Sequence, residues 1–314
     1  MESTITIKNN NVVEQETATS SSDSIENEKT SFLKIISDLT KFRITFFVSV
    51  TTIVGYILYS GRFNLEMILP ALGVLILASG ASALNEYQER NSDKLMKRTS
   101  NRPIPSGNLS ANNALFISLG FIVAGLFVLW MQSFLVMTLG FITLVWYNLV
   151  YTPMKAKYAL AIVPGSLIGA LPPIIGYAAA GGDIFSFSIL TLASFLFIWQ
   201  IPHFWLLLLM YDEDYKKGGF PTLTNIFNNV QLSKITYLGI VVLVLSSFLL
   251  PVFSISESLI NFLLLGLLGL ALMIFSYKII FQDEKSIYRN TFMFINLYVL
   301  AILLLISVDK IIHV

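Results

Sequence analysis

Three oxygen-bearing side chains recur at four-residue spacing in one segment of the chain: Asn85, Glu89 and Asp93. Because residues at i, i+4 and i+8 lie on one face of an α-helix, these side chains share a face if the segment is helical. Mg²⁺ is a hard cation that is commonly bound by one or two carboxylates together with substrate phosphate oxygens. The spacing therefore predicts a magnesium site for a phosphorylated substrate. The alternative is a charged helix end at a membrane surface.

Basic side chains follow this acidic segment directly. Lys94, Arg98 and Arg102 come after Asp93, and ammonium and guanidinium groups are the side chains that bind phosphate oxygens. Lys155 follows a later apolar segment, where it either binds phosphate or anchors the chain at the membrane surface. The order of acids and then bases indicates a site that holds a metal and a diphosphate together.

A second acidic segment begins a polar loop that the sequence predicts over residues 211–233. It contains Asp212 and Asp214, and Lys216 follows them. These two carboxylates predict a second set of metal ligands, and Lys216 becomes a further candidate for binding the diphosphate. We expect substitution of either aspartate to be about as damaging to activity as substitution of Asp93.

One histidine lies inside an apolar segment. Trp199 precedes His203 and Trp205 follows it, and an ionisable residue inside a membrane span is by default a functional candidate. If the helix is continuous, His203 lies roughly 13 Å below Asp212 along the axis, inside the membrane, where an apolar acceptor would bind. Pro202 loosens this helix because it lacks a backbone donor. The alternative is a histidine that only hydrogen-bonds to a neighbouring helix.

A membrane is needed to position these side chains. Of 314 residues, 55% are apolar and 12% charged, whereas soluble proteins have about 25% charged residues. Since a span takes about 20 residues, the apolar segments predict nine, at residues 42–60, 66–85, 112–131, 134–151, 158–180, 185–210, 234–253, 258–280 and 290–309. The predicted fold class is all-α and polytopic, with residues 1–30 as a disordered cytoplasmic tail and 31–314 as one intramembrane domain. Soluble Rossmann enzymes are excluded, and the absence of cysteine excludes disulfides and thiolate chemistry.

Lysine and arginine residues predict the orientation. Eighteen of the 20 lie in the tail or in the loops after even-numbered spans, which leaves Arg62 and Lys310 on the other side. Because positively charged loops stay in the cytoplasm, we expect a cytoplasmic N-terminus, an external C-terminus and a site at the cytoplasmic face. The acidic segments follow spans 2 and 6, so a parallel four-helix pseudo-repeat would bring them to one site.

The first acidic segment and its basic residues form one ordered motif, Asn85-x-Tyr87-x-Glu89-Arg90-x-x-Asp93-x-x-Met96-x-Arg98-Thr99-x-Asn101-Arg102-Pro103. This motif resembles the signature of the UbiA-type intramembrane prenyltransferases. Further similarity, to the branch of that family that farnesylates haem, is found at Leu39-Thr40-Lys41-x-Arg43-Ile44, Tyr151-Thr152-Pro153-x-Lys155, Gly169-Ala170-x-Pro172-Pro173-x-x-Gly176, His203-Phe204-Trp205 and Asp214-Tyr215-x-x-Gly218-Gly219-x-Pro221. The chain departs from the family at Glu89, where aspartate is usual, and at Asp212 and Asp214, which are closer together than in the superfamily's Asp-x-x-x-Asp.

The resemblance implies a UbiA-type bundle and a Mg²⁺-dependent transfer of farnesyl from farnesyl diphosphate to a vinyl group of haem b, giving haem O and pyrophosphate. The implied catalytic residues and metal ligands are Asn85, Glu89, Asp93, Asp212 and Asp214, the implied diphosphate ligands are Lys94, Arg98, Arg102, Lys155 and Lys216, and the implied haem contacts are His203, Trp199 and Trp205. It also implies a bacterial cytoplasmic membrane, with haem A synthase or oxidase-assembly factors as protein partners and no nucleic acid.

Two other functions fit parts of the pattern. A prenyltransferase with another aromatic acceptor, such as a quinone precursor, would share the acidic segments, but His203-Phe204-Trp205 and Asp214-Tyr215-x-x-Gly218-Gly219 favour haem. A secondary transporter would place ionisable groups near the membrane midplane, whereas the acids here lie at the ends of spans and His203 is the main internal candidate.

Overall fold

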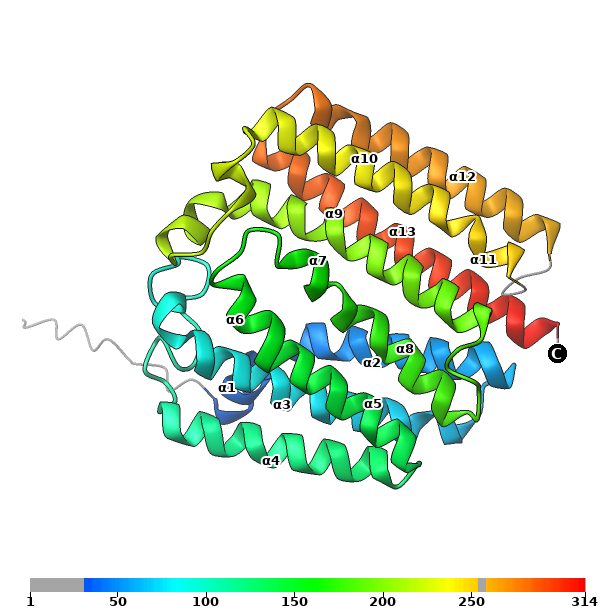
Figure 1. Cartoon of the computed structure of the whole chain (residues 1–314), viewed down its shortest axis with the longest axis horizontal. Helices are drawn as coiled ribbons and strands as arrows, with labels where there is room; N and C mark the ends of the chain where they lie inside the picture. The colour runs from blue at the N-terminus through cyan, green and yellow to red at the C-terminus, as the bar shows by residue number, and fades with distance from the viewer. Residues whose placement is uncertain (1–30, 254–257, 314) are drawn as a thin grey trace, which may run out of the picture.

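The computed structural model describes residues 31–253 and 258–313, and Figure 1 shows them as helices packed side by side. The elements are α1 (Phe32–Leu39), α2 (Phe42–Ser60), η1 (Leu65–Met67), α3 (Ile68–Asp93), α4 (Ala111–Trp130), α5 (Phe134–Val145), η2 (Trp146–Tyr151), α6 (Thr152–Lys155), α7 (Ile162–Gly165), α8 (Leu167–Ala179), α9 (Phe187–Lys217), η3 (Leu223–Asn225), α10 (Asn229–Ser247), α11 (Leu249–Val252), α12 (Leu259–Ser276), η4 (Tyr277–Ile280) and α13 (Lys285–Ile312). In this part of the chain, nine helical segments are long and apolar enough to cross a membrane. The nine predicted spans are confirmed, and the predicted tail, residues 1–30, lies outside the described residues.

Two spans extend beyond their apolar residues. The second runs over Leu65–Asp93 and the sixth over Phe187–Lys217, whereas the sequence predicts that they end at residues 85 and 210. The sequence predicts a loop from residue 211, and this prediction was wrong because residues 211–217 are helical. Hydropathy shows where the apolar residues end, whereas the backbone hydrogen bonds of the helix continue through the polar residues that follow. α9 bends at Tyr211 (φ −126°, ψ 23°) and then continues. Both acidic segments are therefore carried on helix ends.

Capped helices return the chain to the bundle after each acidic segment. The Ser110 side chain accepts the backbone N–H of Asn113 at the start of α4. At the start of α10, Asn228 and Gln231 form a reciprocal capping box. Such caps satisfy backbone donors that a helix start leaves without partners. They define where the two polar connections end.

Close helix packing depends on glycine. A Cβ atom at Gly55 of α2 would lie 1.9 Å from the carbonyl oxygen of Pro173 on α8, and one at Gly176 of α8 would lie 1.8 Å from that of Thr52. Neither position can hold a side chain without moving backbone. Small residues allow membrane helices to approach closely where lipid provides no hydrophobic drive for association. The contact fixes α8 against α2.

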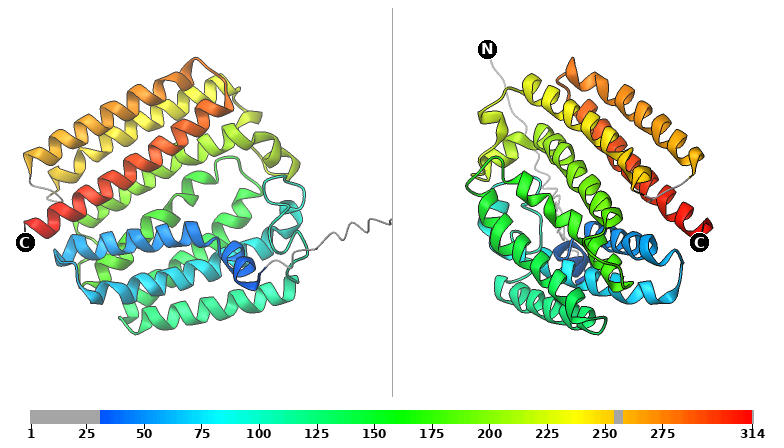
Figure 2. Two further views of the ribbon diagram at one scale, coloured as in Figure 1. Left: turned by 180° about the vertical axis from the view of Figure 1, so that it is seen from behind. Right: turned by 45° about the vertical axis from the view of Figure 1, so that its right-hand side comes forward.

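The spans form two sets. Figure 1 shows α2–α5 in the lower part of the view and α9, α10, α12 and α13 in the upper part, with α8 packed against both α2 and α9. The connections after α3 and after α9 lie at one end of the bundle, and the C-terminal end of α13 lies at the other, as Figure 2 also shows. The predicted pseudo-repeat thus places the ends of α3 and α9 on the same side.

Candidate active site

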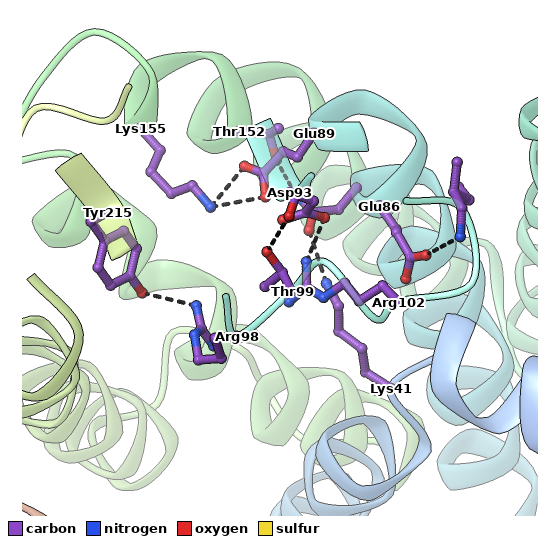
Figure 3. Close-up of polar contacts among 12 residues, drawn as sticks. Lys41, Glu86, Glu89, Asp93, Arg98, Thr99, Arg102, Thr152, Lys155 and Tyr215 are labelled. Carbon is purple, nitrogen blue, oxygen red and sulfur yellow. Dashed lines mark hydrogen bonds and ion pairs between the residues drawn. The ribbon is translucent and has the colours of Figure 1, made fainter. Parts of the chain in front are cut away.

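Asn85, Glu89 and Asp93 are buried on the last turns of α3, and Asp93 is 0% exposed. Each has a cationic partner from another part of the chain: Lys41 Nζ lies 2.9 Å from Asn85 Oδ1, Lys155 Nζ lies 2.7 Å from Glu89 Oε1, and Arg102 Nη1 lies 2.7 Å from Asp93 Oδ2 (Figure 3). We call these six residues the α3 charge row. The fold thus gathers three cations from separate segments around one helix face.

A π-helical turn, Trp146–Tyr151, helps to place Lys155. Its Asn148 is buried and donates hydrogen bonds to a carbonyl oxygen and a side-chain oxygen of α3. Immediately after the turn, the Thr152 hydroxyl accepts a hydrogen bond from Asn85 Nδ2 at 3.1 Å. These bonds hold the end of the fourth span against α3, which brings the Lys155 ammonium group to the acids. π-helical turns occur frequently at functional sites.

The segment after α3 folds back over the end of that helix. Glu86 Oε1 accepts the backbone N–H of Ile104 at 3.0 Å, and the Thr99 hydroxyl donates to the backbone carbonyl of Asp93 at 2.9 Å. These bonds hold Arg102 beside the Asp93 carboxylate. Glu86 is fully buried and was missed as a site residue. The sequence signal for it was an acid directly after Asn85.

Lys41 is the second residue that the sequence prediction of the site missed. It lies between α1 and α2 with a positive φ of 51°, a conformation that is uncommon for residues other than glycine. Burial, followed by the nearby Arg102 guanidinium, lowers the pKa of Lys41 to about 7. An anion bound beside the amine would favour its charged form. The available signal was the Leu39-Thr40-Lys41 motif, which was interpreted only as a resemblance.

The two aspartates of α9 have different partners. Asp212 Oδ2 pairs with Lys216 Nζ one turn later at 2.7 Å, and its other oxygen accepts a hydrogen bond from the Thr224 hydroxyl. Asp214 Oδ2 accepts the backbone N–H of Arg98 at 3.0 Å. The structure thus brings the two acidic segments into contact at Arg98.

The Arg98 side chain makes the same connection. Its Nη2 lies 3.4 Å from the Tyr215 hydroxyl (Figure 3). The Arg98 guanidinium also lies 5.3 Å from the ring centre of Tyr211 and 5.6 Å from that of Tyr215. Lys94 is exposed and makes no ion pair with the described residues. The five predicted diphosphate ligands therefore divide into a partly buried pair beside α3, Arg102 and Lys155, and an exposed set, Lys94, Arg98 and Lys216.

His203 lies within the sixth span and faces α13. Its Nδ1 is 2.9 Å from Asn296 Oδ1, and its ring centre is 5.0 Å from that of Trp199 and 4.5 Å from that of Phe292. Trp205 comes two residues later, about 200° further around the helix axis, so it lies on the other side of α9. The predicted set of three haem contacts is thus split, and Trp199 alone of the two tryptophans accompanies the imidazole.

A comparison with known protein families shows which family this chain matches. Residues 48–298 match the model described as the UbiA prenyltransferase family. The chain belongs to the UbiA prenyltransferase family. It is a multi-pass membrane enzyme that transfers prenyl groups.

Relatives of this UbiA-family chain include three bacterial proteins named protoheme IX farnesyltransferase. The one from Christiangramia forsetii is 32% identical over 92% of this chain and 97% of its own length. The one from Geobacter sulfurreducens is 39% identical over 60% of this chain and 70% of its own length. The one from Legionella pneumophila is 32% identical over 87% of this chain and 93% of its own length.

Solved structures have the same fold. One described as digeranylgeranylglyceryl phosphate synthase has a TM-score of 0.71 at 18% identity, covering 90% of this chain and 99% of that one. A UbiA homologue from Archaeoglobus fulgidus, bound to GPP and Mg²⁺, has a TM-score of 0.61 at 14% identity, covering 87% and 99%. At these identities the likeness establishes the fold, and the predicted UbiA-type bundle is confirmed.

The donors of this UbiA-family chain fit a hard divalent cation. Asp93 Oδ1 and Glu86 Oε2 are buried oxygens that have no hydrogen-bond partner among the described residues. In the same part of the chain, no three histidine, cysteine, aspartate or glutamate residues lie close enough to hold a metal by themselves. Buried carboxylate oxygens without a partner suit Mg²⁺, which takes one or two carboxylates and completes its coordination with water and substrate phosphate oxygens.

Proposed function

We propose that this prenyltransferase moves a farnesyl group from farnesyl diphosphate to a vinyl group of haem b, giving haem O and pyrophosphate. The observation that carries the proposal is the 32% identity, along 92% of the chain, with a relative named protoheme IX farnesyltransferase. The imidazole of His203, enclosed by aromatic rings within a membrane span, supports a flat apolar acceptor.

The α3 charge row is the proposed site for the diphosphate. Mg²⁺, held by Asn85, Glu89 and Asp93, would neutralise charge on the diphosphate. Arg102 and Lys155 bring their charges to the same helix face and bind the diphosphate oxygens. As the C–O bond of the farnesyl group breaks, these cations stabilise the charge on the departing diphosphate, and they do so more strongly than in water because they are already in place beside buried carboxylates.

The second acidic segment contributes from the facing side of the site. We assign Asp212 as a further oxygen donor toward the metal, Asp214 as the carboxylate that bridges to the Arg98 backbone, and the exposed cations Lys94, Arg98 and Lys216 as the groups that first meet the diphosphate. The contact between Asp214 and the backbone of Arg98 supports this assignment, because it joins the two segments.

The acceptor binds deeper, beside His203 and Trp199. A vinyl carbon of the tetrapyrrole attacks the allylic cation at C1 of the farnesyl group, which forms the new carbon–carbon bond. Water then adds to the cation left on the vinyl group and releases a proton, which leaves a hydroxyl group. The aromatic side chains around His203 keep this region apolar and limit premature capture of the allylic cation by water.

Product analysis tests the reaction. The purified chain, in lipid with farnesyl diphosphate, haem b and Mg²⁺, is expected to form a haem that carries one added farnesyl and one added hydroxyl, seen by chromatography and mass spectrometry. Chelation of Mg²⁺ is expected to stop product formation. A parallel reaction with 4-hydroxybenzoate tests the other acceptor class. A farnesylated benzoate without farnesylated haem would reject the proposal.

The proposed location is a bacterial cytoplasmic membrane with the site facing the cytoplasm, where haem A synthase or oxidase-assembly factors are the expected partners. The charge distribution supports this orientation, since eighteen of 20 basic residues belong to one side. Reporter fusions after residues 108, 182 and 225 are expected to read inside, outside and inside. Opposite readings at 108 and 225 would contradict a shared site.

A further inference from the structure

Asn296, in the middle part of α13, holds the His203 imidazole in one defined arrangement. Asn296 Oδ1 lies 2.9 Å from His203 Nδ1, and Asn296 Nδ2 donates to the carbonyl oxygen of Phe292 at 2.6 Å. A carbonyl oxygen can only accept, so the amide nitrogen must face Phe292 and the amide oxygen must face the imidazole. That oxygen is also only an acceptor. The hydrogen in this bond therefore belongs to His203 Nδ1.

This hydrogen bond selects one tautomer. With its hydrogen on Nδ1, the neutral imidazole carries its lone pair on Nε2. Within the described part of the chain, no hydrogen-bond partner occupies Nε2. Histidines that bind metals are oriented in the same way, with one ring nitrogen donating to a fixed oxygen and the other bearing the lone pair.

The surroundings of His203 suit a planar ligand that contains a metal. The rings of Trp199, Phe204 and Phe292 have centres 5.0, 5.4 and 4.5 Å from the imidazole. Trp199 Nε1 is buried and has no hydrogen-bond acceptor among the described residues. A buried donor without an acceptor is costly, so this N–H is available to a ligand that supplies one.

We propose that Asn296 is a positioning residue that fixes His203 as the Nδ1–H tautomer, so that His203 Nε2 binds the iron of the haem acceptor. The proposal rests on the proposed function, because it concerns the acceptor part of the same site. It gives the last span, α13, a role in acceptor binding that neither acidic segment performs.

Two related tetrapyrroles separate iron binding from packing. The full chain in detergent is titrated with haem b and, separately, with iron-free protoporphyrin IX, and absorbance is recorded. Asn296→Leu is expected to weaken haem b binding about 10- to 100-fold, as loss of a partner that orients a metal ligand does, and to shift the haem spectrum. Its affinity for the iron-free porphyrin is expected to stay at the wild-type value.

Matched variants complete the test. Asn296→Asp keeps an acceptor for Nδ1 and is expected to retain haem binding, and Asn290→Leu changes an exposed residue of the same helix and is expected to behave as wild type. Binding of farnesyl diphosphate reports that each variant is folded. If Asn296→Leu loses that binding, Asn296→Ala takes its place.

Two results would overturn the proposal. One is an unchanged haem affinity and spectrum in the folded Asn296→Leu variant, and the other is an equal loss of both tetrapyrroles, which would assign Asn296 a packing role. Failure of the proposed function looks different. If the proposed function is wrong, wild-type protein forms no farnesylated haem. If only the iron contact is wrong, wild-type protein still forms the product, and the haem spectra of wild type and His203→Ala are the same.

Discussion

The two acidic segments follow equivalent spans, yet the protein holds their charges in different ways. On α3, Asn85, Glu89 and Asp93 are at most 8% exposed, and the partners of the first two, Lys41 and Lys155, come from distant parts of the sequence. On α9, the Asp212 side chain is 20% exposed and pairs with Lys216 one turn later. Repetition of a helix pattern has therefore produced one buried cluster of charges and one surface cluster.

Burial decides how much a single charge contributes. Breaking a buried ion pair by removing one partner costs about 3–5 kcal/mol, whereas an exposed i, i+4 pair contributes only about 0.3–0.5 kcal/mol. The α3 charge row is thus the region where loss of one group should affect the reaction most. The α9 segment, through its bonds to Arg98, is suited to holding the two connections together.

The largest effect is expected for Asp93→Asn. The substitution removes a buried carboxylate from the proposed diphosphate site, and it leaves the Arg102 guanidinium without its anion. Loss of one such electrostatic contact costs about 100- to 1,000-fold in rate. The measurement is the rate of prenyl transfer at saturating Mg²⁺, normalised to folded protein in the membrane. A rate comparable to wild type would show that the α3 segment is only a charged helix end.

A smaller but substantial loss is expected for Lys41→Met. The variant keeps the length of the side chain but removes the amine beside Asn85, whose charged form a bound anion would favour. A hydrogen bond that involves a charged group contributes about 1.5–3 kcal/mol, which corresponds to roughly 10- to 100-fold in rate or in diphosphate affinity. Lys34→Met is the matched control, because Lys34 is exposed on the preceding helix. Equal activity of the two variants would remove Lys41 from the site.

Hydropathy predicted the spans well where the membrane boundary and the helix boundary coincide. The predicted span 42–60 has the same bounds as α2, because Lys41 precedes it and Gly61, with a φ of 63°, ends it. It failed at the ends of α3 and α9, where polar residues continue the helix beyond the membrane. A scale of apolarity contains no information about backbone hydrogen bonds in water.

Residue spacing predicted those members of the site that lie on one helix. Asn85, Glu89 and Asp93 are one face of α3, as their period requires. Lys41 was missed because its contact with Asn85 spans 44 residues, and only tertiary structure brings the two together. The same limit applies to Asn296, which lies 93 residues from the histidine that it contacts.

A sharper comparison of the two regions comes from Asp214. The sequence predicts that it binds metal and that its loss is as damaging as that of Asp93, whereas its contact with the Arg98 backbone suggests a bridging role. Asparagine keeps an oxygen that accepts this N–H, so Asp214→Asn is expected to remain within about threefold of wild type. Asp214→Ala removes the acceptor and is expected to lose about 1 kcal/mol, or roughly fivefold. Steady-state rates for both variants, beside Asp93→Asn, decide the question: equally severe losses in the two Asp214 variants would make Asp214 a metal ligand.

The smallest effect is expected at Tyr215, which contacts Arg98 of the first segment. Its hydroxyl lies 3.4 Å from Arg98 Nη2, a long hydrogen bond at an exposed position, so Tyr215→Phe should change the rate by less than about twofold. Tyr215→Leu also removes the ring face beneath the guanidinium, an interaction of about 0.5–1 kcal/mol at an exposed site. Because Arg98 is one of the groups proposed to meet the diphosphate first, this loss should raise the KM for farnesyl diphosphate two- to fivefold while kcat stays unchanged. A lower kcat at unchanged KM would instead place Tyr215 at the reacting atoms, and the division between a buried catalytic cluster and a surface cluster would have to be redrawn.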